Sequence, residues 1–130
     1  MSEEFKVEIV NPEKSFLSKE DAIEVVVPAF EGEMGILKNH IAIISFLKPG
    51  IIKIITQSSD EMYFVEDGIV EFKNDNLSIL TSSIFNLTEM EQSKREELLK
   101  KSEEEANNPK ISDQSKFLVN QKIEVLKSLN

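Results

Sequence analysis

Short runs of β-branched and aromatic residues, separated by turn-forming residues, fill the chain from Phe5 to Leu80. Turn signals recur at intervals of about ten residues, the spacing expected of an all-β sandwich or barrel. Residues of these types fit the pleated, half-buried surface of a sheet. The predicted strands are Phe5–Val10, Ile23–Val27, His40–Phe46, Ile51–Ile55, Met62–Val65, Ile69–Phe72 and Leu77–Leu80.

The turns between these strands are predicted from Pro, Gly, Asn, Asp and Ser, which supply the backbone angles that turns require. Lys48-Pro49-Gly50 is the clearest case, because Pro fixes φ and Gly tolerates a left-handed conformation after it. The remaining predicted turns are Asn11-Pro12, Pro28, Gly32 with Gly35, Ser58-Ser59-Asp60, Glu66-Asp67-Gly68 and Asn74-Asp75-Asn76.

The character of the chain changes after Asn86, where Glu, Lys, Gln and Leu replace the β-branched residues. This change predicts two domains, residues 1–85 as the sandwich and residues 86–130 as a helical unit. Thr88 with Glu91 matches a capping box, which predicts the start of a first helix. Asn107-Asn108-Pro109 predicts its end, because Pro cannot continue a helix.

A second helix is predicted from Ser112 or Asp113 to about Leu129, and its short connection to the first favours an antiparallel hairpin. The first helix offers few apolar side chains for burial: Met90, Leu98, Leu99 and Ala106. Weak burial favours a helical unit that can detach from the sandwich and dock again. The sequence therefore suggests a mobile arm.

The composition excludes several classes of function. A net charge of −9 provides no basic field for phosphates, so nucleic acid is not expected as a partner. With no Cys and one His, the chain cannot form disulfides or the usual zinc sites of Cys and His. The acidic N-terminus does not match an export signal, and the longest apolar run is too short to span a bilayer. Any membrane association is therefore expected to be peripheral.

No motif for nucleophilic catalysis or nucleotide binding occurs in the chain. We expect no catalytic residue, cofactor or metal. Glu31 and Glu33 flank Gly32 and could hold a cation, but a third ligand is missing, which favours a solvated or interface turn. For His40 two interpretations remain, an imidazole bonded to backbone at a strand end or an interface contact.

Three sequence strings occur in a specific order: Glu31-Gly32-Glu33-Met34-Gly35-Ile36 with His40 four residues later, then Lys48-Pro49-Gly50-Ile51-Ile52-Lys53-Ile54, then Gly68-Ile69-Val70-Glu71-Phe72. Together they closely resemble the epsilon subunit family of F-type ATP synthases, from about Phe5 to the C-terminus. The resemblance implies a ten-stranded β-sandwich followed by a two-helix antiparallel hairpin.

The resemblance also implies a non-catalytic rotor subunit of the central stalk, which couples proton flow to ATP synthesis. Its sandwich would bind the gamma subunit and the c subunits of the membrane ring, with Glu31, Glu33 and His40 in the contact region. Its hairpin would transiently reach the alpha/beta catalytic head and oppose ATP hydrolysis. Such a subunit would lie on the cytoplasmic face of a bacterial inner membrane, attached through the complex.

The chain departs from the family pattern at two places. Leu37-Lys38-Asn39 stands where the family has Pro-Gly before the His, and Asn39 can supply the left-handed conformation that the turn needs. ATP-sensing members carry an Asp and an Arg where this chain has Thr88 and Glu91, followed by Gln92 in place of Ala. A carboxylate at the Arg position would repel a triphosphate, so no ATP binding is expected.

An acidic adaptor or chaperone-like module that binds a basic client is the alternative function. A small cupin-like enzyme fits less well, since its metal site would need several His residues.

Overall fold

The computed structural model describes residues 3–12 and 15–129, and within them nine strands precede two helices. The strands and helices are β1 (Phe5–Val10), β2 (Ser15–Ala29), β3 (Gly32–Leu37), β4 (Ile43–Leu47), β5 (Gly50–Thr56), β6 (Asp60–Val65), β7 (Gly68–Lys73), β8 (Asn76–Leu80), β9 (Ile84–Asn86), α1 (Gln92–Ala106) and α2 (Asp113–Ser128).

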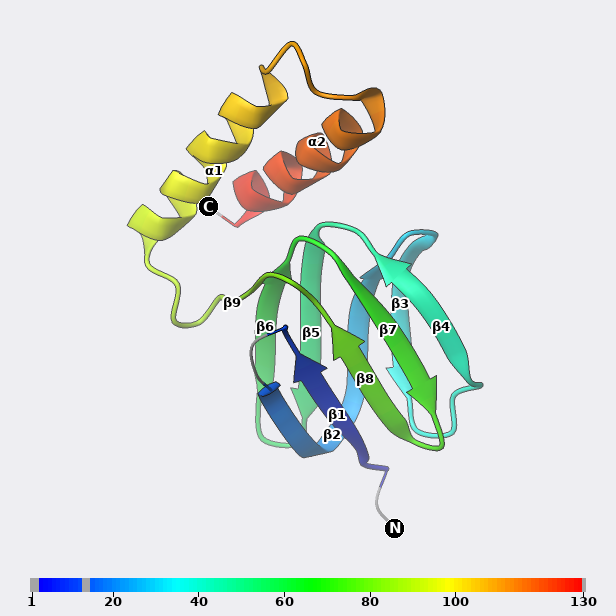
Figure 1. Ribbon diagram of the computed structural model, residues 1–130. Coiled ribbons are helices and arrows are strands. Elements are labelled where there is room, and N and C mark those ends of the chain that lie inside the picture. The colour runs from blue at the N-terminus through cyan, green and yellow to red at the C-terminus, as the bar shows by residue number, and fades with distance from the viewer. Residues whose placement is uncertain (1–2, 13–14, 130) are drawn as a thin grey trace.

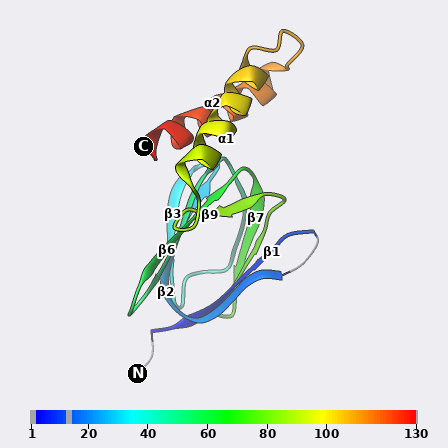
Figure 2. The ribbon, with the colours of Figure 1, turned by 90° about the vertical axis from the view of Figure 1, so that its left-hand side faces the viewer.

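The strands form two layers, as Figures 1 and 2 show. The front layer has the order β1-β8-β7-β4, and the back layer has the order β3-β2-β5-β6-β9. β1 pairs with β8 in parallel and with the first part of β2 antiparallel, which joins the layers along one side. The predicted sandwich and hairpin are therefore confirmed.

The described strands number nine and not the expected ten, because β2 is unusually long. Its fifteen residues pair with β1 near the start and with β3 and β5 near the end. One continuous strand thus serves both layers.

The space between the layers is filled by sixteen buried apolar side chains among the described residues. Alternation along the strands places them there, as in β5, where Ile52 and Ile54 point inward. Phe5 meets Phe72 edge to face, with ring centroids 5.6 Å apart. The sandwich therefore has a complete core of its own.

Two of the predicted turns are wrong. Pro28 lies inside β2, and both Gly32 and Gly35 lie in β3, so the chain reverses at Phe30 and Glu31 instead. A Cβ at Gly35 would lie 2.9 Å from Oε2 of Glu24 on the neighbouring strand. This glycine is therefore explained by close packing within a sheet and not by a turn.

The capping-box prediction at Thr88 is also wrong, although the helix it announced exists. α1 has Glu91 as its N-cap, without a side-chain cap. The amide of Thr88 donates instead to Oδ1 of Asn86 at 2.9 Å, so Thr88 belongs to a turn before the helix. In α2 the predicted cap is confirmed, since Oγ of Ser112 accepts from the amide of Ser115 at 3.1 Å.

Candidate interaction surfaces

An apolar band made of Ile44, Phe46, Ile69 and Leu80 lies exposed on the outer face of the front layer. Register aligns Phe46 on β4 with Ile69 on β7, and Ile69 with Leu80 on β8. Ile44 and Phe46 keep 70% and 65% of their surface exposed, although both lie in a strand whose other face is in the core. Four large apolar side chains in neighbouring strands make a continuous surface that water solvates poorly.

A shallow groove of about 540 Å³ runs along this band. Pro12 and three members of the band, Phe46, Ile69 and Leu80, line it, and Asp67, Thr81 and Ser82 add polar groups. The carboxylate of Asp67 accepts hydrogen bonds from the amide and hydroxyl of Ser82, at 3.1 Å and 2.8 Å. The groove is therefore preformed, with a fixed polar edge.

Further apolar side chains lie exposed around β3 and β4, at Phe30, Leu37 and Ile41. The amide of Phe30 donates to the carbonyl of Phe46 at 3.1 Å, which brings the β2–β3 turn against the apolar band. Across the described residues, β3 has a strand partner on one side, which is β2. This side of the sandwich thus combines an open strand edge with apolar side chains.

The structure does not bring the three predicted interface residues together. Glu31 lies in the β2–β3 turn, where Oε2 accepts from the hydroxyl of Ser45 at 3.3 Å. Glu33 lines a hollow of about 270 Å³ beside α2, at the same end of the sandwich. His40 follows β3 at the opposite end, near the β7–β8 turn. One strand length therefore separates the carboxylates from the imidazole.

His40 bonds to backbone, as one of its two interpretations required. Its Nδ1 lies 2.7 Å from the carbonyl oxygen of Ile41, and since a carbonyl can only accept, Nδ1 carries the proton. The imidazole also meets the ring of Phe72 edge to face, with centroids 6.0 Å apart. The neighbouring Asn39 has φ 68°, which confirms the predicted left-handed turn, and its amide donates to Oδ1 of Asp75 at 2.8 Å.

A second apolar cluster joins the hairpin to the sandwich, and the sequence pattern did not reveal it. Phe64 points out of the back layer and is fully buried against Leu98 of α1 and Leu126 of α2. The sequence feature that could have revealed it is the unbroken apolar run Tyr63-Phe64-Val65, whose members are all buried. A strand covered on both faces has no alternation of apolar and polar residues.

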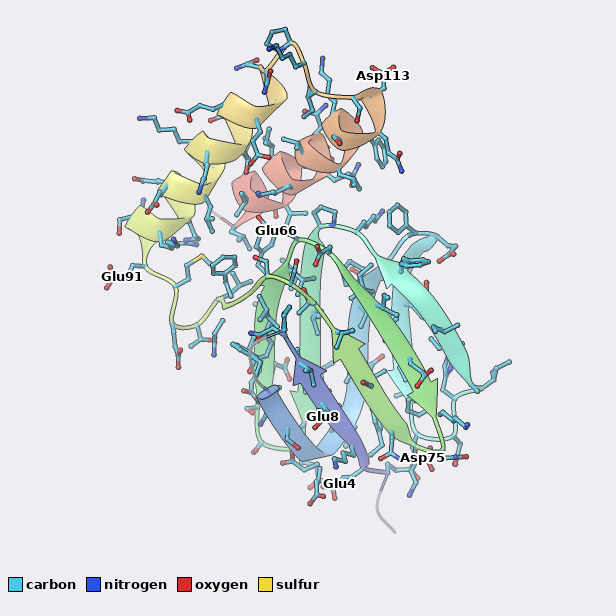
Figure 3. The ribbon with its side chains drawn as sticks, viewed as in Figure 1. Glu4, Glu8, Glu66, Asp75, Glu91 and Asp113 are labelled. Carbon is cyan, nitrogen blue, oxygen red and sulfur yellow. The ribbon has the colours of Figure 1, made fainter. Side chains whose placement is uncertain are left out.

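Charged groups reinforce this junction. Nζ of Lys122 on α2 pairs with Glu66 in the β6–β7 turn and lies 3.8 Å from Oε1 of Glu105 on α1. Figure 3 shows Glu66 at the end of the sandwich that faces α2. Within the hairpin, Arg95 donates to the carbonyl of Leu129 at 2.7 Å and closes the two helices together.

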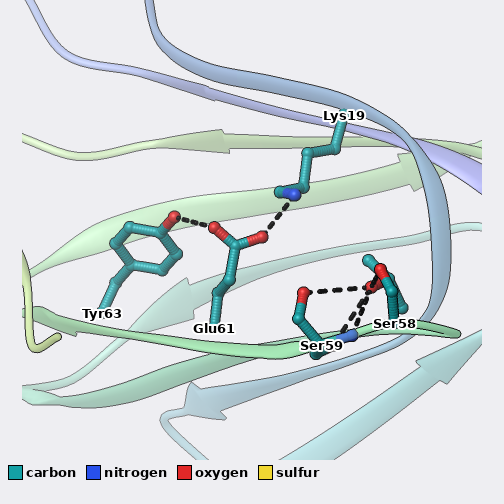
Figure 4. A network of polar contacts seen from close by, with 6 residues as sticks. Lys19, Ser58, Ser59, Glu61 and Tyr63 are labelled. Carbon is teal, nitrogen blue, oxygen red and sulfur yellow. Dashed lines mark hydrogen bonds and ion pairs between the residues drawn. The ribbon is translucent and has the colours of Figure 1, made fainter.

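A polar network links the first part of β2 to β6 (Figure 4). Glu61 pairs with Lys19 and accepts a hydrogen bond from the hydroxyl of Tyr63 at 2.9 Å. The bond to Glu61 raises the pKa of Lys19, although burial opposes it. Burial, with help from Glu61, raises the pKa of Tyr63. These shifts describe a structural brace between strands.

Comparison with known proteins identifies the family to which this architecture belongs. A family model described as the β-sandwich domain of the ATP synthase delta/epsilon chain matches residues 4–86. An ATP synthase epsilon chain of Pelagibacter ubique is 71% identical over 130 residues, which covers all of both chains. The chain belongs to the ATP synthase epsilon family. The resemblance of the three sequence strings is thereby confirmed.

The comparisons also found more distant similarities. An ATP synthase epsilon chain of Dichelobacter nodosus is 33% identical over 110 residues, covering 84% of this chain and 76% of its own. A chain in the mitochondrial ATP synthase structure of Euglena gracilis has TM-score 0.77 at 18% identity, covering 99% of this chain and 81% of that chain. The fold of this chain therefore also occurs in a protein chain with which it shares little sequence identity.

The described residues of this epsilon-family chain form two helices, α1 and α2. Neither is long and apolar enough to span a membrane. The same ranges contain no cluster of three or more His, Cys, Asp or Glu residues that could hold a metal ion.

Proposed function

We propose that this chain is a non-catalytic rotor subunit in the central stalk of an F-type ATP synthase, coupling proton flow to ATP synthesis. The observation that carries the proposal is the apolar band, because a folded chain with a complete core has no internal use for Ile44, Phe46, Ile69 and Leu80 in water. We assign this band to the contact with the gamma subunit. Rigid strands hold it in place, so binding orders few side chains.

The contact with the c subunits of the membrane ring is assigned to the side of the sandwich formed by β3 and β4. Glu31 and His40 lie at opposite ends of β3, so a contact at one end of the sandwich would reach only one of them. A contact along β3 would reach Glu31, Glu33 and His40 together. The two carboxylates on this side, Glu31 and Glu33, favour ring loops that carry Arg.

Copurification tests the role of the apolar band. In cells whose only epsilon chain is tagged Phe46→Glu, placing a charge in the band should reduce recovery of head and ring subunits from detergent-extracted membranes at least tenfold. Met62→Glu is the matched control, because Met62 is an exposed apolar residue of the back layer. Equal recovery with both variants would contradict the proposal.

The domains are proposed to divide the work, with residues 1–85 attaching the subunit and residues 86–130 regulating it. The hairpin would transiently contact the alpha/beta catalytic head and oppose ATP hydrolysis. Its compact docking on one end of the sandwich supports this division, because it leaves the apolar band uncovered (Figure 1). The subunit would then lie on the cytoplasmic face of a bacterial inner membrane, attached through the complex.

We propose that the isolated chain does not bind ATP. Glu91 is exposed at the N-cap of α1, and Thr88 and Gln92 beside it are exposed as well. Of these, the carboxylate of Glu91 would repel a triphosphate. Micromolar affinity in a calorimetric titration with ATP would overturn this part of the proposal. The alternative of a free-standing adaptor has no observation in its favour that the rotor subunit does not explain equally.

A further inference from the structure

Lys122 belongs to two ion pairs, of which only one would break if the hairpin left the sandwich. Its pair with Glu66 crosses from the hairpin to the sandwich, whereas its pair with Glu105 stays within the hairpin. The Lys122 side chain is 14% exposed and that of Glu66 28%, while Glu105 remains 51% exposed. Partial burial makes the pair with Glu66 the stronger one, since water screens it less.

Glu66 is held by a rigid turn. Its neighbour Asp67 is tied to Ser82, and the carbonyl of Asp67 accepts from the hydroxyl of Thr81 at 2.7 Å. The next residue, Gly68, fits so closely that a Cβ would lie 2.8 Å from the carbonyl oxygen of Leu80. The turn therefore holds Glu66 in a fixed position on the sandwich, so the pair can open only when Lys122 moves with α2.

Contacts inside the hairpin do not depend on the sandwich. Arg95 bonds to the carbonyl of Leu129, the hydroxyl of buried Ser102 donates to the carbonyl of Leu98, and Lys122 keeps Glu105. Leaving the sandwich would break the pair with Glu66 and expose Phe64, but would leave these contacts in place. The two helices can therefore leave the sandwich while still packed against each other.

We propose that the Lys122–Glu66 ion pair is a latch that sets how often the hairpin leaves the sandwich, and that Lys122 hands its charge to Glu105 when the latch opens. The latch is a property of the isolated chain. Its meaning for ATP hydrolysis rests on the proposed function.

A single introduced cysteine can measure the opening, because the native chain has none. Val125 is partly buried between α2 and the sandwich, in the hollow that Glu33 also lines. In the full-length Val125→Cys background, the rate of thiol labelling reports the open population when opening is fast.

Glu66→Gln and Lys122→Gln should each raise the labelling rate about three- to tenfold, the effect of losing a partly buried ion pair. Glu105→Gln is the matched control, since it removes the pair inside the hairpin, and should change the rate less than twofold. Exchanging the charges in Glu66→Lys with Lys122→Glu should restore slow labelling in the Glu105→Gln background, where no second carboxylate lies beside position 122. Raising salt should speed labelling of the parent and have little effect on Glu66→Gln.

Equal labelling rates in the parent, Glu66→Gln and Lys122→Gln would overturn the latch. Faster labelling accompanied by loss of helical circular dichroism would also overturn it, because the hairpin would then be unfolding and not moving intact. Both readouts use the isolated chain, so they stand apart from the copurification experiment. A working latch in a chain that does not join the complex would refute the proposed function alone.

Discussion

The sandwich and the hairpin are stabilised in very different ways. Sixteen buried apolar side chains fill the sandwich among the described residues, and strand pairing closes it along one side. The cluster that joins the hairpin to the sandwich has three buried members, Phe64, Leu98 and Leu126, with partly buried residues around them. The first unit has a core of its own, and the second is held in position by this small apolar cluster and one ion pair.

This difference agrees with the proposed division between an attaching sandwich and a regulating hairpin. A surface used for permanent attachment needs a scaffold that does not open, and the apolar band lies on such a scaffold. A regulatory element must leave its docked position at modest cost, which small apolar contacts permit. The hairpin fits that requirement better than the sandwich does.

The largest expected effect concerns the sandwich core. Phe72→Ala should lower the free energy of unfolding by about 3–5 kcal/mol, because it leaves a cavity between the layers. Urea denaturation followed by circular dichroism measures the loss. Leu126→Ala should leave the unfolding of the strands nearly unchanged and affect the helices first. Equal losses of strand signal in both variants would show that the sandwich and the hairpin unfold as one cooperative unit. That result would contradict their separate stabilisation.

Phe64→Ala should release the hairpin while the sandwich stays folded. Loss of this fully buried ring removes roughly 2–3 kcal/mol of apolar burial from the junction. In NMR spectra the amide signals of α1 and α2 should shift, and hydrogen exchange in β1, β7 and β8 should stay slow. The control Met62→Ala changes an exposed neighbour on the same strand. Faster exchange in the front layer would contradict the separation of the two units.

Alkaline pH should weaken the sandwich through the Lys19–Glu61–Tyr63 network. The raised pKa of Lys19 means that its stabilisation is complete below the ordinary value of 10.5 and is lost as pH rises through the higher folded value. Tyr63 acts in the same direction above its ordinary value of 10.0, because the unfolded chain releases the proton first. Denaturation between pH 9 and 12 should show falling stability, and a shallower fall in Tyr63→Phe. A parallel fall in both chains would exclude the contribution of Tyr63.

The smallest expected effect is at the left-handed turn before His40. Asn39→Val should cost about 1–2 kcal/mol, since a β-branched residue is strained at φ 68°, whereas Asn39→Gly should be close to neutral. Thermal unfolding compares the two. If valine costs no more than glycine, the turn is flexible and does not hold its left-handed form.

Much of the fold could be predicted because local chemistry agreed with the final structure. Strands such as β5 and β7 follow their apolar runs, and Ser112 caps α2 as its hydroxyl allows. The start of β2 at Ser15 was missed, because its first residues pair with β1 in a hairpin with register shifts and do not follow a regular apolar pattern of their own. β3 was taken for a turn because of its two glycines: Gly35 is explained by close approach to Glu24, which only the folded sheet reveals, and Gly32 has a positive φ of 139° within the strand.

The candidate site was less predictable. The motif at Glu31, Glu33 and His40 could be read along the chain, but their separation along β3 could not, since it follows from strand direction. The apolar band joins β4 to the β7–β8 hairpin, which is distant from β4 in sequence and aligned with it by register. Lys122 and Glu66 lie far apart in the chain and carry no local signal of their pairing.

The most direct test of the division between attachment and regulation is deletion of residues 88–130 in cells that assemble the whole complex. The yield of complex and the rate of ATP hydrolysis are then measured on the same membranes. The account predicts normal recovery of head and ring subunits with faster hydrolysis, since the sandwich keeps the apolar band and the inhibitory hairpin is gone. Unchanged hydrolysis in a fully assembled complex would contradict the regulatory role of the hairpin, and failed assembly would contradict attachment through the sandwich.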